Sequence, residues 1–174
     1  MNAESTFRWR SRLGVAVGVF LLYGLFNVFA AIQVPLTQHA KGITMPQIMS
    51  SAADSRVLGK DISTLAQSDR ALSDYMVAFM DTMCMEMMAF GILQIAIVWF
   101  ALRRRQPWAL GALLVADLSF IPYLAGWTSI FSRYGATWAE SLASFGGTWV
   151  IVTVLIAGAA ALGWSDLNRA AAPA

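Results

Sequence analysis

The chain has 174 residues, of which 58% are hydrophobic and only 13% are charged. Its mean hydropathy is positive, and its formal net charge at pH 7 is +2. A soluble domain of this size cannot bury so large an apolar fraction, so the composition excludes an ordinary water-soluble fold. So small a net charge also argues against nucleic acid as a partner.

Four apolar stretches are long enough to cross a bilayer as helices. The hydrocarbon core of a bilayer is about 30 Å thick, so a crossing helix needs about 20 apolar residues. The stretches that meet this requirement are about 13–34, 76–102, 108–127 and 145–164. They predict an all-α integral membrane protein, a four-helix bundle that forms a single membrane domain over residues 1–174.

The arginines indicate which helix ends face the cytoplasm, because short segments rich in Lys and Arg stay on that side of a membrane. They cluster before the first span and in the turn between the second and third spans, at Arg8, Arg10, Arg12, Arg103, Arg104 and Arg105. We therefore expect a multi-pass protein of the inner (plasma) membrane, surrounded by lipids, with cytoplasmic N and C termini.

The segment from Pro35 to Tyr75 is predicted to be an outer loop of about 40 residues that is partly helical. Thr44 and Gln47 have the spacing of a capping box, which predicts a short helix over 45–53, and Gly59 ends that pattern. Two residues are suited to cap an extension of the second span, Ser68 and Asp69. The loop is either a lid on the bundle or a docking surface for a partner.

A methionine stripe runs along the second span. Steps of four and three residues connect Met76, Met80, Met83, Met87, Phe90 and Gln94. This spacing is typical of the seam of a left-handed helix pair, and thioether side chains fill irregular gaps in such seams. The stripe therefore predicts a packed helix interface.

Copper binding is the alternative interpretation of this stripe, because soft sulfur ligands favour Cu(I). The pair Met76-x-x-x-Met80 resembles the paired methionines of Ctr-type copper transporters, although that family has three spans and a methionine-rich outer tail. A copper site would be formed by Met76, Met80, Met83, Cys84 and Met87.

Three carboxylates lie in the predicted spans, and none of these spans contains Lys or Arg. Asp81 and Glu86 are five residues apart, so they point about 140° away from each other on a helix and cannot share a proton. Asp117 lies halfway along the third span, where an ionised carboxylate costs several kcal/mol unless it is paired, hydrated or protonated. We expect Pro122 to kink this span close to Asp117.

Neutral side chains of other spans are the predicted partners of Asp117. Tyr23 and Asn27 share a face of the first span, and Gln94 lies nearer than Glu86 to the depth of Asp117. The predicted ligand-binding site, open to the outer side through its second-span acids, is Asp117, Glu86, Asp81, Asn27, Tyr23 and Gln94. A purely structural hydrogen-bonding role for Asp117 is the alternative.

Small residues predict close helix contacts. Gly14 with Gly18, and Ala157 with Ala161, have the small-x-x-x-small spacing that lets helix backbones approach. These pairs suit a tight bundle, a homo-oligomer or a larger membrane complex.

Few catalytic motifs are possible in this sequence. His39 is the only histidine and is expected to be exposed in the outer loop, so a histidine metal cluster or a Ser-His-Asp triad is excluded. One cysteine excludes a CxxC redox pair. We predict no catalytic residues, and no cofactor is indicated.

The segments Arg12-Leu13-Gly14 and Phe20-Leu21-Leu22-Tyr23-Gly24, together with the four spans, resemble DoxX-type and related small bacterial membrane proteins. The turn Leu102-Arg103-Arg104-Arg105 before Pro107-Trp108-Ala109 is similar to the inner-face turn of such proteins. The resemblance covers about a third of the chain, and the long outer loop and the Met-rich second span depart from it. It implies a bacterial inner-membrane four-helix bundle.

The function predicted from these patterns is that of a non-catalytic accessory or ligand-binding bundle with a polar intramembrane site around Asp117. One alternative is an oligomeric transporter or channel for protons, cations or copper that uses Asp81, Glu86, Asp117 and the methionine stripe. The other is a membrane enzyme that acts on lipid or quinone by carboxylate chemistry.

Overall fold

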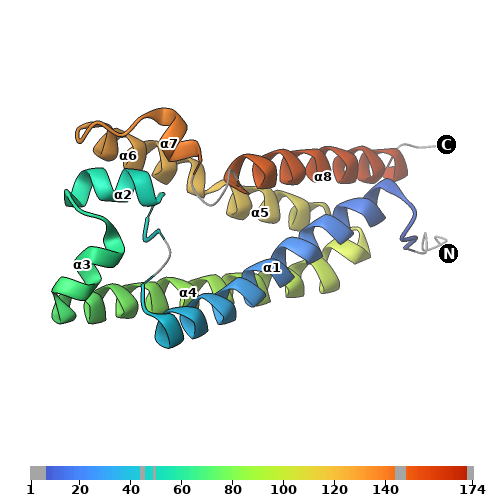
Figure 1. Cartoon of the computed structure of the whole chain (residues 1–174). Coiled ribbons are helices and arrows are strands. Elements are labelled where there is room, and N and C mark those ends of the chain that lie inside the picture. Colours follow the sequence, from blue (N-terminus) through green and yellow to red (C-terminus); the bar gives the residue numbers. More distant parts are fainter. Residues whose placement is uncertain (1–6, 44–45, 49, 144–147, 172–174) are drawn as a thin grey trace. The chain divides into compact units, whose positions relative to one another are not determined.

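The computed structural model describes residues 7–43, 46–48, 50–143 and 148–171, and within these ranges all regular elements are helices (Figure 1). In chain order they are α1 (Arg12–Lys41), α2 (Ser51–Leu58), α3 (Ile62–Ser68), α4 (Arg70–Phe100), the 3-10 helix η1 (Leu102–Arg104), α5 (Pro107–Leu118), α6 (Phe120–Ser132), α7 (Trp138–Leu142) and α8 (Thr148–Ala171). The predicted all-α class is confirmed.

Four segments are long and apolar enough to cross a membrane. They are Arg12–Lys41, Arg70–Arg104, Pro107–Ser132 and Val150–Arg169. Each overlaps one of the predicted spans, and the first residues of the fourth predicted span, 145–147, lie outside the described residues. The four apolar segments predicted from the sequence are therefore confirmed.

The long helices expose apolar side chains that a water-soluble protein would bury. Leu22 is 69% exposed and Phe29 is 64% exposed on α1, and Val154 is 66% exposed on α8. Continuous apolar surfaces of this kind mark contact with lipid or with another protein. The exposed face of the molecule thus agrees with the membrane character of its composition.

The chain folds into two compact units. Unit 1 contains, of the described residues, 7–28, 89–118 and 153–171, and unit 2 contains the others. Helices α1, α4 and α8 each contribute one part to either unit.

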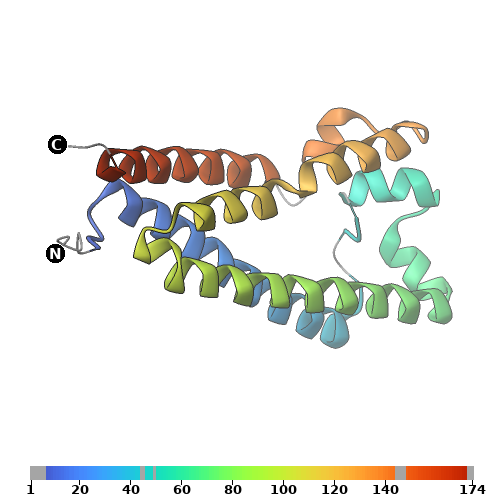
Figure 2. The ribbon, with the colours of Figure 1, turned by 180° about the vertical axis from the view of Figure 1, so that it is seen from behind.

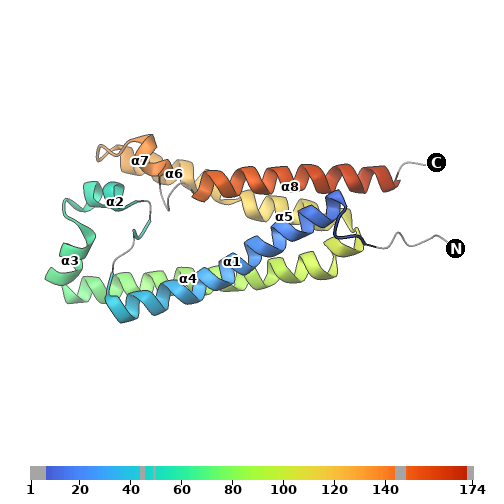
Figure 3. The same ribbon diagram turned by 45° about the vertical axis from the view of Figure 1, so that its right-hand side comes forward.

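Unit 1 is built on the N-terminal half of α1, the C-terminal half of α4, α5 and most of α8. α1 buries Leu13, Ala16, Val17 and Phe20 completely, at the i, i+3, i+4, i+7 spacing of one helix face. Gly163 of α8 lies against Ala16 of α1 and Leu110 of α5. Figure 3 shows α8 beside α5 and the first turns of α1.

α1 and α4 approach each other closely in unit 1, at Gly24 and Gly91. A Cβ atom at Gly91 would lie 2.8 Å from the carbonyl oxygen of Gly24, so only glycine permits this approach. The predicted small-residue pairs do not make this contact within the described part of the chain, and a role for them in a homo-oligomer or a larger complex stays a prediction. A Cβ at Gly18 would meet no atom within 4 Å, and Ala157 and Ala161 are both exposed. Spacing alone did not show which helix face is buried.

In unit 2, α1 continues past Pro35 to Lys41, and α4 already begins at Arg70. The first residues of the predicted outer loop, 35–41, are therefore helical, and the predicted extension of the second-span helix before Met76 is confirmed. The buried face of α1 continues through Ala31 and Gln38, which explains the extra turns. Asp69 accepts a hydrogen bond from the backbone N–H of Leu72 at 3.0 Å, which confirms it as a cap of α4.

The short helix predicted over 45–53 instead begins at Ser51. Thr44 and Met45 lie outside the described residues, and Ser50 is the N-cap, whose hydroxyl accepts from the N–H of Ala53. The Asp54 carboxylate accepts from the N–H groups of Gln47 and Ile48 at 2.8 and 3.4 Å, which holds that stretch in a non-helical turn. Gly59, with φ of 67°, ends α2 as predicted.

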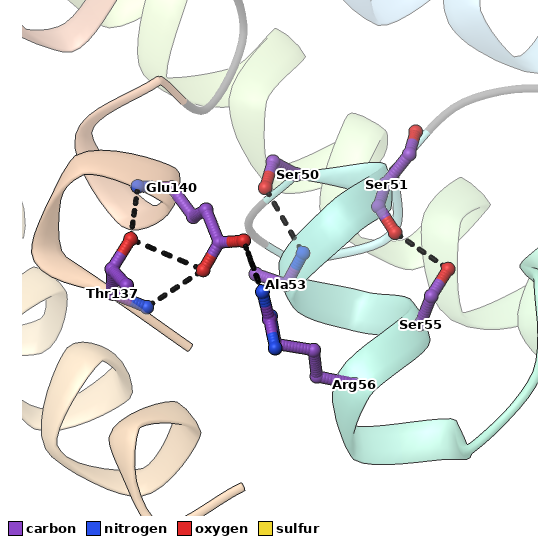
Figure 4. A network of polar contacts seen from close by, with 7 residues as sticks. All are labelled: Ser50, Ser51, Ala53, Ser55, Arg56, Thr137 and Glu140. Atoms are coloured by element: carbon purple, nitrogen blue, oxygen red, sulfur yellow. Dashed lines mark hydrogen bonds and ion pairs between the residues drawn. The ribbon is translucent and has the colours of Figure 1, made fainter. Parts of the chain in front are cut away.

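α2 packs against α3, α6 and α7 within unit 2. Figure 2 shows these helices from behind. Arg56 of α2 donates to the Glu140 carboxylate of α7 at 2.8 Å, and Glu140 also accepts from the backbone N–H of Thr137 (Figure 4). Ala53, Phe131 and Ala136 form the small core below this ion pair.

The third span is interrupted between α5 and α6. α5 ends at Leu118 and α6 begins at Phe120, with Pro122 in its first turn. Proline cannot donate to the carbonyl four residues earlier, which is that of Leu118. The predicted break in the helix beside Pro122 is confirmed.

Candidate functional site

The buried residues of α4 have the predicted spacing, but only some of them belong to the predicted methionine stripe. Met80, Cys84, Gly91, Gln94 and Val98 are buried, whereas Met83 is 45% exposed. With the half-buried Met87, these positions repeat at steps of four and three, which is the seam of a helix pair. The glycine and the cysteine belong to the seam because their small side chains allow the helices to approach.

The sulfur atoms predicted as copper ligands are only partly brought together. Met80, Cys84 and Met87 pack with Ala31 and Val34 in the core of unit 2. Met83 points outward, and Met76 lines a cavity described below. In the described part of the chain, no group of three or more His, Cys, Asp or Glu side chains is arranged to hold a metal ion.

Asp117 lies in the interior of unit 1. Its side chain is 2% exposed, as is that of Gln94. The amide nitrogen of Gln94 donates to Asp117 Oδ2 at 3.4 Å and to the backbone carbonyl of Phe20 at 3.1 Å. The predicted contact between Asp117 and Gln94 is thus confirmed, and the second bond fixes the amide against α1.

Tyr23 and Asn27 of α1 complete this polar cluster. The Asn27 amide nitrogen donates to the carbonyl oxygen of Tyr23 at 3.0 Å, and Asn27 is 5% exposed. The Tyr23 side chain lies within electrostatic range of Asp117. We call Tyr23, Asn27, Gln94 and Asp117 the polar centre of unit 1.

The polar centre has more acceptors than donors. Among the described residues, Asp117 Oδ1 and Gln94 Oε1 are both buried and make no hydrogen bond. A buried acceptor that lacks a donor costs about 1 to 3 kcal/mol. The predicted spans 13–34, 76–102 and 108–127, which supply these residues, contain no Lys, Arg or His to compensate the carboxylate. The polar centre can therefore accept a proton or hydrogen bonds from a donor group.

Asp81 and Glu86 are not part of the polar centre. Both belong to unit 2, where Glu86 is exposed. Asp81 Oδ2 lies 2.9 Å from Nε2 of His39, at the last turn of α1. The sequence predicted an exposed His39 in a loop, and it is 60% exposed but helical and paired. The signal that would have revealed the pair is the continuation of the buried α1 face to Gln38.

A second polar cluster, which the sequence reasoning missed, lies where the arginines gather in unit 1. Asp166 of α8 accepts from the backbone N–H of Leu13 at 3.3 Å and forms an ion pair with Arg105 at 3.4 Å. Arg103 packs over the rings of Trp99, Phe7 and Trp9, with its guanidinium carbon 3.9 Å from the Trp99 ring centre. This end of unit 1 therefore combines cations with aromatic rings.

Comparison of the chain with protein-family models, with curated proteins and with solved structures returned no match.

Proposed function

We propose that the chain is a small multi-pass protein of a bacterial inner membrane, a four-helix bundle that acts as a non-catalytic ligand-binding or accessory component. The four apolar segments and their exposed apolar faces support the membrane placement. The resemblance of the first span and the arginine turn to DoxX-type proteins supports the bacterial inner membrane.

Both termini are proposed to be cytoplasmic. The support for this orientation is the cluster of Arg103, Arg105 and Arg12 with Trp9 and Trp99 in unit 1, since arginines stay on the cytoplasmic side and indole rings prefer the headgroup level.

The observation that carries the proposed binding function is the polar centre. Asp117 is buried without a cation, and its Oδ1 and the Oε1 of Gln94 both lack donors among the described residues. Ionisable residues inside a membrane span usually mark a functional site. The ligand we propose is a small molecule whose polar group donates hydrogen bonds, such as a hydroxyl or a protonated amine.

Native mass spectrometry of the protein released from its own membrane tests this function. The wild-type protein should carry a bound small molecule in stoichiometric amount, and Asp117→Asn should lose it, because an amide NH2 donor replaces the acceptor oxygen Oδ1. Asp74→Asn is the matched control, since Asp74 is a carboxylate whose side chain is 74% exposed at the start of α4. Measuring the copper content of the same sample tests whether the sulfur-containing residues of α4 bind copper.

Three results would contradict the proposal. A wild-type protein without any bound molecule would leave Asp117 a structural residue. Proton or cation flux in vesicles that Asp117→Asn abolishes would favour a transporter. Turnover of a bound lipid or quinone that is lost in Asp117→Ala or Glu86→Ala would favour an enzyme.

A further inference from the structure

Unit 2 contains a cavity of about 320 Å³ that is separate from the residues of the polar centre. α2 and α3 form one side of it, and the first three turns of α4 form another. Figure 1 shows these three helices together. The side chains that line it come mainly from Val57, Leu58, Ile62, Leu65, Leu72, Tyr75, Met76, Phe79 and Phe131.

The lining of this cavity is apolar. Asp54 is the carboxylate among the lining residues, and it already accepts from two backbone N–H groups, those of Gln47 and Ile48. The side chains of α3 and α4 that line the cavity are aliphatic, aromatic or thioether groups. Such a surface offers little to a charged or sugar-like ligand but buries hydrocarbon well.

The position of the cavity along α4 connects it with the apolar span. Its α4 wall runs from Leu72 to Phe79, at the start of the helical segment Arg70–Arg104 that is long and apolar enough to cross a membrane. Several lining residues are also open to the outside, because Tyr75 is 69% exposed and Phe79 and Leu58 are each 41% exposed. A chain that leaves the bilayer beside α4 can therefore enter the cavity, while its polar head remains outside.

We propose that this cavity binds the hydrocarbon chain of a lipid, either an acyl chain or an isoprenoid chain. Its volume lies within the range of small-molecule sites, about 300 to 1,000 Å³. That size suits a single hydrocarbon chain. The outer-loop helices α2 and α3 then form the cover of a lipid site.

Photocrosslinking with a fatty acid that carries a diazirine near the end of its tail tests the proposal on the full-length protein in detergent. Peptide mapping should place the crosslinks on α3 and on residues 72–79 of α4, and excess palmitate should suppress them at least tenfold. Competition by hexanoate should be weak, because its short chain fills little of the cavity. This comparison uses the wild-type protein and is independent of any variant.

Leu65→Trp should fill the cavity and reduce crosslinking on α3 and α4 at least tenfold. Val115→Trp is the matched control, because Val115 is 74% exposed on α5 and its replacement leaves the cavity unchanged. Competition with the probe by a phospholipid, compared with competition by a polyisoprenol, then shows whether the bound chain is an acyl or an isoprenoid chain. Crosslinks spread over the exposed faces of α1 and α8, or equal suppression by palmitate and hexanoate, would overturn the proposal.

Discussion

Two aspartates of unit 1 lie in apolar helices but have different surroundings. Asp166 of α8 pairs with Arg105 and also accepts from the N–H of Leu13, and its side chain is 21% exposed. Asp117 of α5 is 2% exposed, and the hydrogen bond it receives from a side chain comes from the neutral amide of Gln94. One carboxylate is compensated by a cation, and the other is not.

The difference shows that the position of a carboxylate along a span determines whether it is structural or available to bind another group. At the end of a span, long arginine side chains are available to neutralise a carboxylate, so Asp166 connects α8 with η1 and the start of α1. In the middle of a span no cation is present, so Asp117 keeps an acceptor oxygen for another group. We therefore regard Asp166 as structural and Asp117 as the candidate binding residue.

The largest loss of stability is expected for Gly91→Ala. This substitution disrupts the polar centre of Asp117 without changing a charge. The new Cβ would lie 2.8 Å from the Gly24 carbonyl oxygen and 3.1 Å from Asn27 Cβ, so α1 and α4 must separate. Overpacking of this kind costs about 1 to 3 kcal/mol. Unfolding in mixed SDS micelles measures the loss, and ligand loss should accompany it because Gln94 lies one turn from Gly91.

Gly111→Ala is the control for this variant, because a Cβ at Gly111 of α5 would have no atom within 4 Å. It should leave the free energy of unfolding unchanged or raise it slightly. Equal stability of the two variants would mean that α1 and α4 do not approach each other closely at Gly24 and Gly91.

The next prediction compares the two aspartates directly. Asp166→Ala removes an ion pair and a helix-end acceptor, and should lower the free energy of unfolding by about 1 to 2 kcal/mol. Asp117→Leu should cost about 1 kcal/mol through unpaired partners, whereas Asp117→Asn should cost little, because its amide oxygen still accepts from Gln94. SDS unfolding of the three variants measures these differences.

Ligand binding is expected to depend on the two aspartates in the opposite order to stability. Asp117→Asn should lose the bound molecule although it folds well, and Asp166→Asn should retain it. If Asp117→Asn were strongly destabilised, or if both variants kept the ligand, the division into a structural and a binding aspartate would be wrong.

Composition and periodicity predicted the coarse features of the fold. The four apolar segments follow from the number of consecutive apolar residues, and the pairing of Asp117 with Gln94 follows from counting residues along antiparallel helices. Gly59 and Asp69 were found because their residue types are characteristic of helix ends. These features depend on local sequence or on one-dimensional length.

The features that sequence reasoning missed depend on which face of a helix is buried. The methionine stripe and the small-residue pairs had suitable spacings, but Met83 and Ala157 are exposed and the contact is made by Gly91. His39 was assigned to a loop because it lies beyond the first apolar stretch, 13–34. The apolar cavity of unit 2 is formed by helices whose side chains meet only after the chain has folded.

The smallest change in stability is expected at a third carboxylate, Glu140 of unit 2. Like Asp166, Glu140 has a cationic partner. The N–H of Thr137 and the Arg56 guanidinium hold the pKa of Glu140 below its ordinary value of 4.5. A carboxyl whose pKa is lower in the folded state stabilises the fold fully above its ordinary pKa, and this contribution is lost as the pH falls through the folded pKa. The contact between α2 and α7 should therefore weaken only below about pH 4.5.

Hydrogen exchange of the α2 amides, corrected for the intrinsic rate at each pH, measures this weakening. Wild-type α2 should lose protection as the pH is lowered below that value, and Glu140→Gln should show lower protection at neutral pH with a smaller further loss in acid, because it has no charge to lose. The same acid-induced loss in both proteins would show that Arg56 and Glu140 do not secure α2. A pH dependence that survives only in the wild type would place Glu140 with Asp166 among the structural carboxylates, in contrast to Asp117, which is buried without a cation among the described residues of unit 1.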